Sequence, residues 1–377
     1  MTETATQDLT RIPQPCLQAP DGPKRKLVAG VIGCGSISRF HFEGFAKADV
    51  RVARLCDVSQ EAAQPWVERT SAKWSSDWRE VVDDPEIDVI AVLTSTSTHR
   101  AICEGAIAAG KAVICEKTLA STLDDSVAIT ETALKAKAIF FTNYMKRYLP
   151  TIVKAKALLP TLGQIISTHV RVHQYWGDCW GECPPTDDLF GKSALGSSKV
   201  LTSYGGGILF CGGSHLIDLV TYLLGRPTKV YSEILKLPGR DFDNRATAHL
   251  TTSNGVVHFE AIGGPLKHVG YLGDGWDERI EIMGTLGSLN ILTPEWDQGN
   301  HKSSRLVHYD NMIDAAVEYR FAAVSPFVSA IAAYCRDIED GLQRVQSPLT
   351  GYEVDEVIHT MYRSAETGLA QDIIWRL

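Results

Sequence analysis

Two parts of the sequence combine residue types and spacing suited to dinucleotide binding. The segment Gly33-Cys-Gly-Ser-Ile-Ser38 follows an apolar, strand-sized run and opens a helical pattern. Its first glycine permits a tight turn, its second lets the backbone approach a diphosphate, and the helix N-terminus offers free amides to phosphate. Asp57 ends the next strand-like run, where a carboxylate can accept hydrogen bonds from an adenosine ribose. The predicted cofactor-binding residues are Gly33, Gly35, Ser36, Ile37 and Asp57.

The same carboxylate bears on the choice of cofactor. Asp57 would repel a 2′-phosphate, and the residues that follow it, Val58, Ser59 and Gln60, supply no arginine to bind one. This predicts NAD in preference to NADP. The alternative is a glycine turn in an unrelated α/β fold, but the strand, turn, helix and acidic residue occur together here.

Lys117 lies at the carboxyl end of a predicted strand, where ligand crevices form in open α/β sheets. Its ammonium group could bind an alcohol oxygen and stabilise developing alkoxide charge. The alternative is a solvated lysine in a loop, which strand-end position alone would favour. Glu116 beside it and the resemblance described below favour a catalytic role.

A second candidate group follows further along the chain. Cys211, His215 and Asp218 share one face of a helix predicted over residues 208–224. An imidazole titrates near neutral pH and is suited to proton transfer, although a purely structural histidine is an even alternative from the residues alone. Asp218 is interpreted as a scaffold carboxylate. Cys179 and Cys183, together with Cys211 and His215, could form part of a zinc ligand set. These positions are scattered and lack a zinc-knuckle signature, so no metal is predicted.

These residues must be positioned by two kinds of sheet. Short apolar runs alternate with helical patterns from residue 26 to residue 142, which predicts βαβ units and a doubly wound parallel sheet of the Rossmann type. Strand-like segments separated by short turns then predict a large, mostly antiparallel open sheet in a C-terminal α/β domain. These segments are residues 165–175, 228–236, 246–252, 256–262, 279–283 and 288–292, followed by helices at about 326–342 and 352–372.

The length of 377 residues suggests two domains. Residues 1–25 contain a proline-rich stretch and are predicted to form a flexible arm. Residues 26–147 would form the dinucleotide-binding domain, and residues 148–377 a domain for substrate binding and oligomerisation whose last helices pack back on the first. Residues 177–204 form a long polar stretch, which in a compact domain is usually functional or disordered.

Composition excludes several classes of partner. The net charge is −8, and no basic run extends beyond Lys24-Arg25-Lys26, so nucleic acid and anionic membranes are poor partners. No apolar stretch reaches the roughly 18 residues of a membrane span, and the N-terminus lacks the apolar region of a signal peptide. The sequence has nine cysteines, an odd number that cannot all pair in disulfides within one chain. This count and the lack of a signal peptide predict reduced thiols in the cytoplasm.

Five segments together resemble the glucose–fructose oxidoreductase, inositol 2-dehydrogenase and rhizopine-catabolism (Gfo/Idh/MocA) family. The resemblance covers nearly the whole chain from about residue 26. The segments are Gly33-Cys-Gly-Ser-Ile-Ser38 with Cys56-Asp57, Thr94-Ser-Thr-Ser-Thr-His99, Gly110-Lys-Ala-Val-Ile-Cys-Glu-Lys117, Met145-Lys-Arg-Tyr-Leu-Pro150, and the glycine-rich stretch from Gly205 to Asp218 that contains His215.

The resemblance implies an NAD-dependent oxidoreductase that moves hydride between nicotinamide and a ring carbon of a sugar, a cyclitol or a related alcohol or ketone. It also implies a homodimer or homotetramer. It places Lys117 and His215 in catalysis, Thr94, Thr96, His99, Glu116, Lys117 and Met145 at the cofactor, and Lys117, Lys146 and His215 at the substrate. Tyr175 and Trp176 could stack on a sugar, with ordinary sheet packing an equal alternative.

Two residues depart from the family pattern. Thr118 replaces the proline of the Glu-Lys-Pro motif, and Cys211 replaces the aspartate that pairs with the histidine in inositol-dehydrogenase-like members. These departures leave two alternatives of other kinds. One is a non-catalytic nucleotide-binding sensor, and the other is NAD-dependent glycoside cleavage in which hydride is borrowed and returned.

Overall fold

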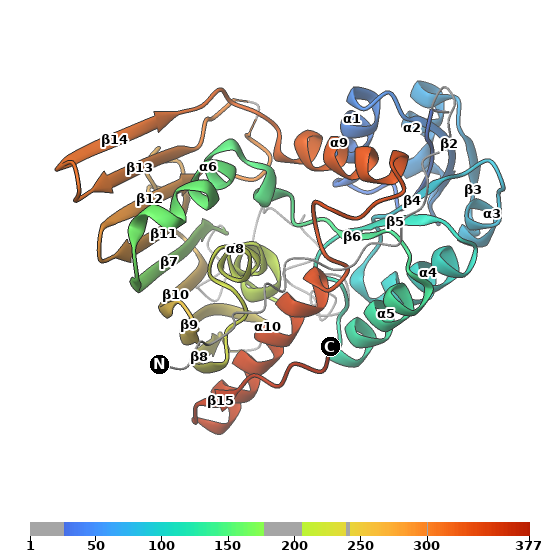
Figure 1. Ribbon diagram of the computed structural model, residues 1–377. Coiled ribbons are helices and arrows are strands. Elements are labelled where there is room, and N and C mark those ends of the chain that lie inside the picture. The colour runs from blue at the N-terminus through green and yellow to red at the C-terminus, as the bar shows by residue number, and fades with distance from the viewer. Residues whose placement is uncertain (1–25, 177–205, 239–241, 300) are drawn as a thin grey trace, which may run out of the picture.

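The computed structural model describes residues 26–176, 206–238, 242–299 and 301–377. The predicted arm and the polar stretch with Cys179 and Cys183 lie outside these ranges. Two sheets organise the described chain, with helices packed around the first sheet and along one side of the second (Figure 1). Within the described residues, no helix is both long enough and apolar enough to cross a bilayer.

The first sheet has six parallel strands in the order β3-β2-β1-β4-β5-β6. They are β1 (Val28–Ile32), β2 (Arg51–Cys56), β3 (Lys73–Ser75), β4 (Val89–Val92), β5 (Ala112–Cys115) and β6 (Phe140–Thr142). Strands β1, β4, β5 and β6 are buried throughout, which explains their uninterrupted apolar sequences. The strand order reverses at β1, so the carboxyl ends of β1 and β4 flank the ligand crevice of such sheets. The predicted doubly wound sheet is confirmed.

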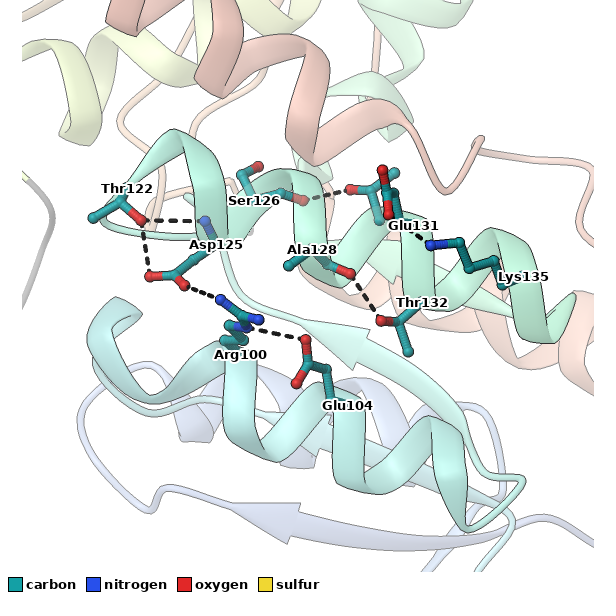
Figure 2. Close-up of polar contacts among 10 residues, drawn as sticks. Arg100, Glu104, Thr122, Asp125, Ser126, Ala128, Glu131, Thr132 and Lys135 are labelled. Carbon is teal, nitrogen blue, oxygen red and sulfur yellow. Dashed lines mark hydrogen bonds and ion pairs between the residues drawn. The ribbon is translucent and has the colours of Figure 1, made fainter. Parts of the chain in front are cut away.

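Five helices connect these strands. They are α1 (Ser38–Lys47), α2 (Gln60–Thr70), α3 (Trp78–Val82), α4 (Thr96–Ala108) and α5 (Leu123–Ala136). The start of α5 is a capping box, in which the Thr122 hydroxyl accepts a hydrogen bond from the Asp125 amide at 3.2 Å. Figure 2 shows that the Asp125 carboxylate also binds Arg100, which links α5 to α4.

The second sheet has nine strands in the order β14-β13-β12-β11-β7-β10-β9-β8-β15. Only the β7–β10 pair is parallel among these described strands, so the mostly antiparallel open sheet is confirmed. The strands are β7 (Ile165–Tyr175), β8 (Lys229–Lys236), β9 (Asp243–Thr252), β10 (Gly255–Gly264), β11 (Trp276–Gly284), β12 (Gly287–Thr293), β13 (Arg305–Asp310), β14 (Ala315–Arg320) and β15 (Gln371–Asp372). Burial alternates along β7, which separates an inner, covered face from an outer one.

The inner face is covered by helices that also reach the first sheet (Figure 1). These elements are the 3₁₀ turns η1 (Met145–Tyr148) and η2 (Leu159–Leu162), with α6 (Pro150–Leu158), α8 (Ser214–Leu224) and α10 (Thr350–Thr367). Helix α9 (Pro326–Glu339) instead joins the core of the first sheet. Helix α9 packs against α1, and α10 packs against α5, α8 and β8. The predicted helix over residues 352–372 was too long. It ends at Thr367 because Gly368 adopts a left-handed φ of 66° that stops the helix.

Asp355 on α10 fastens this helix to the segment that follows β5. Its carboxylate accepts a hydrogen bond from the Ala120 amide at 3.1 Å, and the residue is fully buried. Burial raises the pKa of Asp355 to about 8, against which the hydrogen bond from the Ala120 amide acts only in part. The folded protein therefore holds this proton at pH values where the unfolded chain has released it.

We expect the stability of the protein to fall as pH rises from about 4 to about 8, because Asp355 must lose its proton in a dry site. The side chain of Asp355→Asn is neutral at every pH in this interval. The free energy of unfolding of the variant, relative to that of wild type, should therefore rise by up to about 1.4 kcal/mol per pH unit. Urea unfolding at several pH values measures the difference. The exposed Asp372→Asn is the control, and a pH-independent difference for Asp355→Asn would contradict the prediction.

Candidate functional site

The turn between β1 and α1 fits the diphosphate of a dinucleotide. Gly33 has a φ of 100° and its amide donates to the Cys56 carbonyl at 2.8 Å, and a Cβ there would lie 2.7 Å from the Leu93 backbone. Gly35 instead faces open space. Within the described chain, the amides of residues 35–37 meet no protein acceptor. Free amides at a helix N-terminus are what a phosphate group requires.

Asp57 is held beside this turn at the end of β2. One carboxylate oxygen accepts from the Cys34 amide at 2.7 Å, and the other accepts from the Ser59 amide at 2.8 Å. These bonds leave further lone pairs on a partly exposed carboxylate. A ribose hydroxyl could donate to these lone pairs, so the predicted role of Asp57 stays a prediction.

His99 braces the loops that follow β4 and β5. Its Nδ1 lies 3.0 Å from the Leu119 carbonyl oxygen and its Nε2 lies 3.1 Å from that of Thr94. Burial lowers the pKa of this histidine, although those carbonyls oppose the shift. Thr96, also predicted at the cofactor, shares a hydrogen bond of 2.7 Å with Ser121. The structure thus shows His99 and Thr96 joining two strand-end loops at the edge of the crevice.

Glu116 plays a similar bracing part directly before Lys117. Its Oε1 lies 2.7 Å from His41 Nε2 and accepts from the Asn143 amide at 2.8 Å, while its Oε2 accepts from the Lys117 backbone amide at 3.2 Å. Burial acts to raise the pKa of Glu116, but His41 and Asn143 outweigh it and the pKa is lowered. Met145 is 1% exposed and packs in the core of the first sheet. Glu116 and Met145, both predicted at the cofactor, are thus in contact with other side chains of the protein.

Lys117 extends from the end of β5 to the second domain. Its Nζ donates to the carbonyls of Phe210 and Cys211 at 3.2 and 3.0 Å. The peptide bond between Lys117 and Thr118, which stands where the family has proline, is cis. An ammonium group has three N–H donors, so one remains for a ligand.

The carbonyls that receive Lys117 belong to a π-helical turn, Leu209–Gly213, which directly precedes α8. The turn is closed by a hydrogen bond of 2.8 Å from the Gly213 amide to the Ile208 carbonyl. Buried Asp243 anchors its start by accepting from the amides of Gly207 and Leu209 at 2.9 and 2.8 Å. The single helix predicted over residues 208–224 is therefore interrupted, as π turns often are at functional sites.

This interruption corrects the predicted common face of Cys211, His215 and Asp218. Cys211 lies in the π turn, whereas His215 and Asp218 lie in α8, so the regular α-helical spacing behind the prediction does not extend to Cys211. Asp218 instead forms a buried ion pair with Arg147, whose Nε and Nη2 donate at 2.6 to 3.0 Å. Burial raises the pKa of Asp218 to about 6, although Arg147 opposes this. Asp218 thus joins α8 to η1.

His215 occupies the second position of α8 and is 7% exposed. Its ring packs edge-on against Tyr144, with 5.8 Å between the ring centroids. Burial, followed by the charges of Lys117 and Lys146, lowers the pKa of His215 well below its usual value. Burial raises the pKa of the Cys211 thiol to about 11, although Lys117 opposes this. At neutral pH the imidazole is therefore uncharged, and the thiol supplies no negative charge to it.

Lys146 completes the group from η1. Its ammonium forms a buried ion pair with Glu278 on β11, whose carboxylate also accepts from Thr293 at 2.8 Å and from Gln174 at 3.3 Å. Gly212 of the π turn lets the Gln174 amide approach, because a Cβ at residue 212 would collide with it. Sequence reasoning missed Glu278 and Gln174. Polar residues at otherwise inward-facing strand positions were the available signal.

Tyr175 was also predicted at the substrate, and the structure places it at the end of β7. Successive residues of a strand point to opposite faces, so Tyr175 lies on the outer face. The Lys267 Nζ atom lies 5.7 Å from the centroid of its ring. Gln174 takes the inner position instead. Trp176 is 1% exposed, packs against Gly263 and donates to Gln174 Oε1 at 3.2 Å. Among the described residues, no cluster of histidine, cysteine, aspartate or glutamate could hold a metal ion.

A glycine turn lies at the switch point of a Rossmann sheet, and a second domain contacts that sheet's domain through Lys117. These features define a two-domain, dinucleotide-binding oxidoreductase. The chain belongs to the Gfo/Idh/MocA family. Residues 27–144 match the model of the oxidoreductase family, NAD-binding Rossmann fold, and residues 152–290 match the GFO/IDH/MocA C-terminal domain. The predicted family and the predicted NAD cofactor are confirmed.

Relatives of known activity are similar along much of the chain. Inositol 2-dehydrogenase 2 of Saccharopolyspora erythraea is 29% identical, over 70% of this chain and 73% of its own length. Levoglucosan dehydrogenase of Pseudarthrobacter phenanthrenivorans is 29% identical over 53% and 52% of the two chains. A solved levoglucosan dehydrogenase in complex with NADH and levoglucosan shares the fold, with a TM-score of 0.79 and 20% identity over 93% of this chain and 100% of that one.

Proposed function

We propose that the protein interconverts an alcohol and a ketone at a ring carbon of a sugar or cyclitol, with NAD in preference to NADP. The observation that supports this most is that the Lys117 ammonium, which follows β5, lies 3.0 Å from the Cys211 carbonyl in the turn that leads to His215. The names of the relatives, which act on inositol and levoglucosan, support the substrate class.

The protein groups divide the chemistry in a simple way. The free N–H of Lys117 donates to the substrate oxygen and stabilises the alkoxide character that develops on it. Neutral His215 accepts the hydroxyl proton during oxidation and returns it during reduction. When bound, an NAD cofactor would supply the hydride for reduction or accept it in oxidation. Cys211 supplies no carboxylate partner to the imidazole, and burial, followed by the charges of the two lysines, lowers the pKa of His215.

A screen of cyclitols, aldoses, anhydrosugars and aldonic acids with NAD tests the proposal. We expect the reduced-nicotinamide absorbance to rise with at least one of these classes and the reverse reaction to run with the ketone product. Binding of NADH without turnover of any compound would support a sensor instead. Release of an aglycone from a glycoside without net cofactor reduction would identify glycoside cleavage.

Asp57 should determine the preference between the two cofactors. The wild-type kcat/KM is expected to be higher with NAD, because the carboxylate repels a 2′-phosphate. Asp57→Asn removes that charge while keeping an acceptor for the Cys34 amide, so the NAD-to-NADP ratio should fall by about tenfold or more, which corresponds to about 1.4 kcal/mol. Asp83→Asn on an exposed helix end is the control. A wild-type preference for NADP would contradict the assignment.

A further inference from the structure

Asp243, at the start of β9, is a fully buried carboxylate that binds three donors from two separate segments. It accepts hydrogen bonds from the amides of Gly207 and Leu209 at 2.9 and 2.8 Å. The hydroxyl of Tyr362 on α10 donates to the same oxygen as the Gly207 amide. The Asp243 backbone carbonyl also accepts from the Ile208 amide at 2.9 Å. One residue thus fixes the chain that enters the π turn and ties it to α10.

Two glycines let the chain run this close to its neighbours. A Cβ at Gly207 would lie 1.9 Å from the Asp243 carbonyl oxygen, and a Cβ at Gly206 would lie 2.5 Å from the Phe210 ring. Both distances are far shorter than an ordinary contact between non-bonded atoms. A side chain at either position would therefore displace the entry to the π turn, so these glycines serve close packing on Asp243 and Phe210.

Phe210 connects α10 to Lys117. Its ring is 3% exposed, and the ring centroid lies 5.7 Å from that of His359 and 6.0 Å from that of Tyr362, both on α10. The Phe210 backbone carbonyl accepts from the Lys117 ammonium at 3.2 Å, and the next carbonyl, that of Cys211, accepts from it at 3.0 Å. The side chain of Phe210 is thus held by α10 while its carbonyl holds Lys117.

We propose that Asp243, together with Tyr362, is a positioning residue for Lys117. The carboxylate fixes the π turn, and the two carbonyls of the turn direct the free N–H of Lys117 to the substrate oxygen. This inference rests on the proposed function, in which Lys117 is that donor. Asp243 and Tyr362 act through the turn and need not contact the substrate.

The three donors make the carboxylate hard to replace. Asp243→Asn keeps one oxygen but puts an NH₂ group in place of the other, so at least one donor loses its acceptor. Burial, followed by Asp243, raises the pKa of Tyr362 well above its usual value, so its hydroxyl keeps the proton that it donates. Tyr362→Phe removes this one donor and leaves both amide bonds. The two variants therefore loosen the turn to different degrees without changing Lys117 itself.

NMR of the Lys117 ammonium in the ligand-free protein is the first test. Protein labelled with ¹⁵N-lysine should give a sharp Nζ–H signal for Lys117, because its two hydrogen bonds slow exchange with water. Lys117→Ala assigns the signal by its loss. The exchange rate should rise by about fivefold or more in Asp243→Asn, the effect of losing about one hydrogen bond, and by less in Tyr362→Phe.

A double-mutant cycle in turnover is the second test, with NAD and the sugar or cyclitol that the wild type oxidises in the screen. We expect kcat to fall by about tenfold in Asp243→Asn, because misplacing a catalytic group by a fraction of an ångström to about 1 Å is costly. The affinity for NADH should stay near that of wild type. In Lys117→Ala, adding Asp243→Asn should lower kcat by less than about twofold, because the donor that it positions is already gone.

Asp337→Asn is the matched control, because Asp337 is also buried and accepts from two backbone amides, those of Arg344 and Val345, at 2.6 and 2.9 Å. It should change neither the Lys117 signal nor kcat. A Lys117 signal that is absent from wild type, or unchanged in Asp243→Asn, would overturn the proposal. An equal fall in kcat with and without Lys117 would overturn it as well, because that result marks a general structural defect.

If Asp243→Asn does not fold, Tyr362→Phe carries both tests, because it leaves the carboxylate and its two amide bonds in place. An unchanged Lys117 signal in that variant would again overturn the proposal. The NMR measurement needs no turnover. Faster exchange at Lys117 in a protein that oxidises none of the screened compounds would refute the proposed function while upholding the hold of Asp243 on Lys117. Unchanged exchange in an active dehydrogenase would refute this inference alone.

Discussion

Lys117→Ala is expected to lower turnover by about 10²–10³-fold, the usual cost of removing a donor aimed at developing oxyanion charge. The affinity for NADH should change far less, because the glycine turn and Asp57 lie on other strands and keep their contacts. Stopped-flow or steady-state absorbance measures turnover, and quenching of tryptophan fluorescence measures NADH binding.

Lys135→Ala is a suitable control for this variant, because Lys135 is 76% exposed and pairs only with Glu131 along α5 among the described ion pairs. It should leave both quantities unchanged. Near-normal turnover in Lys117→Ala would show that the lysine anchors the π turn without taking part in the reaction. Loss of NADH binding to the same extent as turnover would point to a cofactor role instead.

His215→Ala should lower turnover by about 10²-fold or more if the imidazole carries the substrate proton. The pKa of His215 lies well below the usual value, so the wild-type enzyme should remain active in oxidation down to acidic pH and lose activity only below it. The variant should lack that acidic limb. The pH dependence of kcat/KM measures both effects.

The exposed His301→Ala is the matched control for this change and should behave as wild type. Full activity in His215→Ala would mean that water or the substrate itself carries the proton. An acidic limb that persists unchanged in a slower variant would assign the titration to another group. Either outcome would remove His215 from the proposed chemistry.

The elements with the strongest local signals were predicted best. Strands β2 and β5 lie within the alternating pattern predicted for residues 26–142, and β7 has its predicted bounds. Helix α2 was missed because Pro65 lies within it and much of its surface is exposed. Strand β15 is two residues long and forms only by pairing with β8, so nothing local indicates it.

The site was predicted where a motif fixes a backbone position, and missed where tertiary packing decides. Gly33 and Lys117 follow from strand-turn logic, since each ends a recognisable strand. The π turn near Cys211 depends on Asp243, a residue distant in sequence. The choice of Gln174 over Tyr175 depends on which face of β7 is covered, and Glu278 depends on a partner in the other half of the chain.

Lys117 connects the two domains of the protein. Its backbone belongs to the first sheet, yet two of its three N–H bonds end on carbonyls of the second domain. In the proposed function, the remaining N–H donates to the substrate oxygen, and these two bonds fix the direction in which it points. Binding of the substrate by Lys117, as proposed, therefore depends on an intact contact between the two domains.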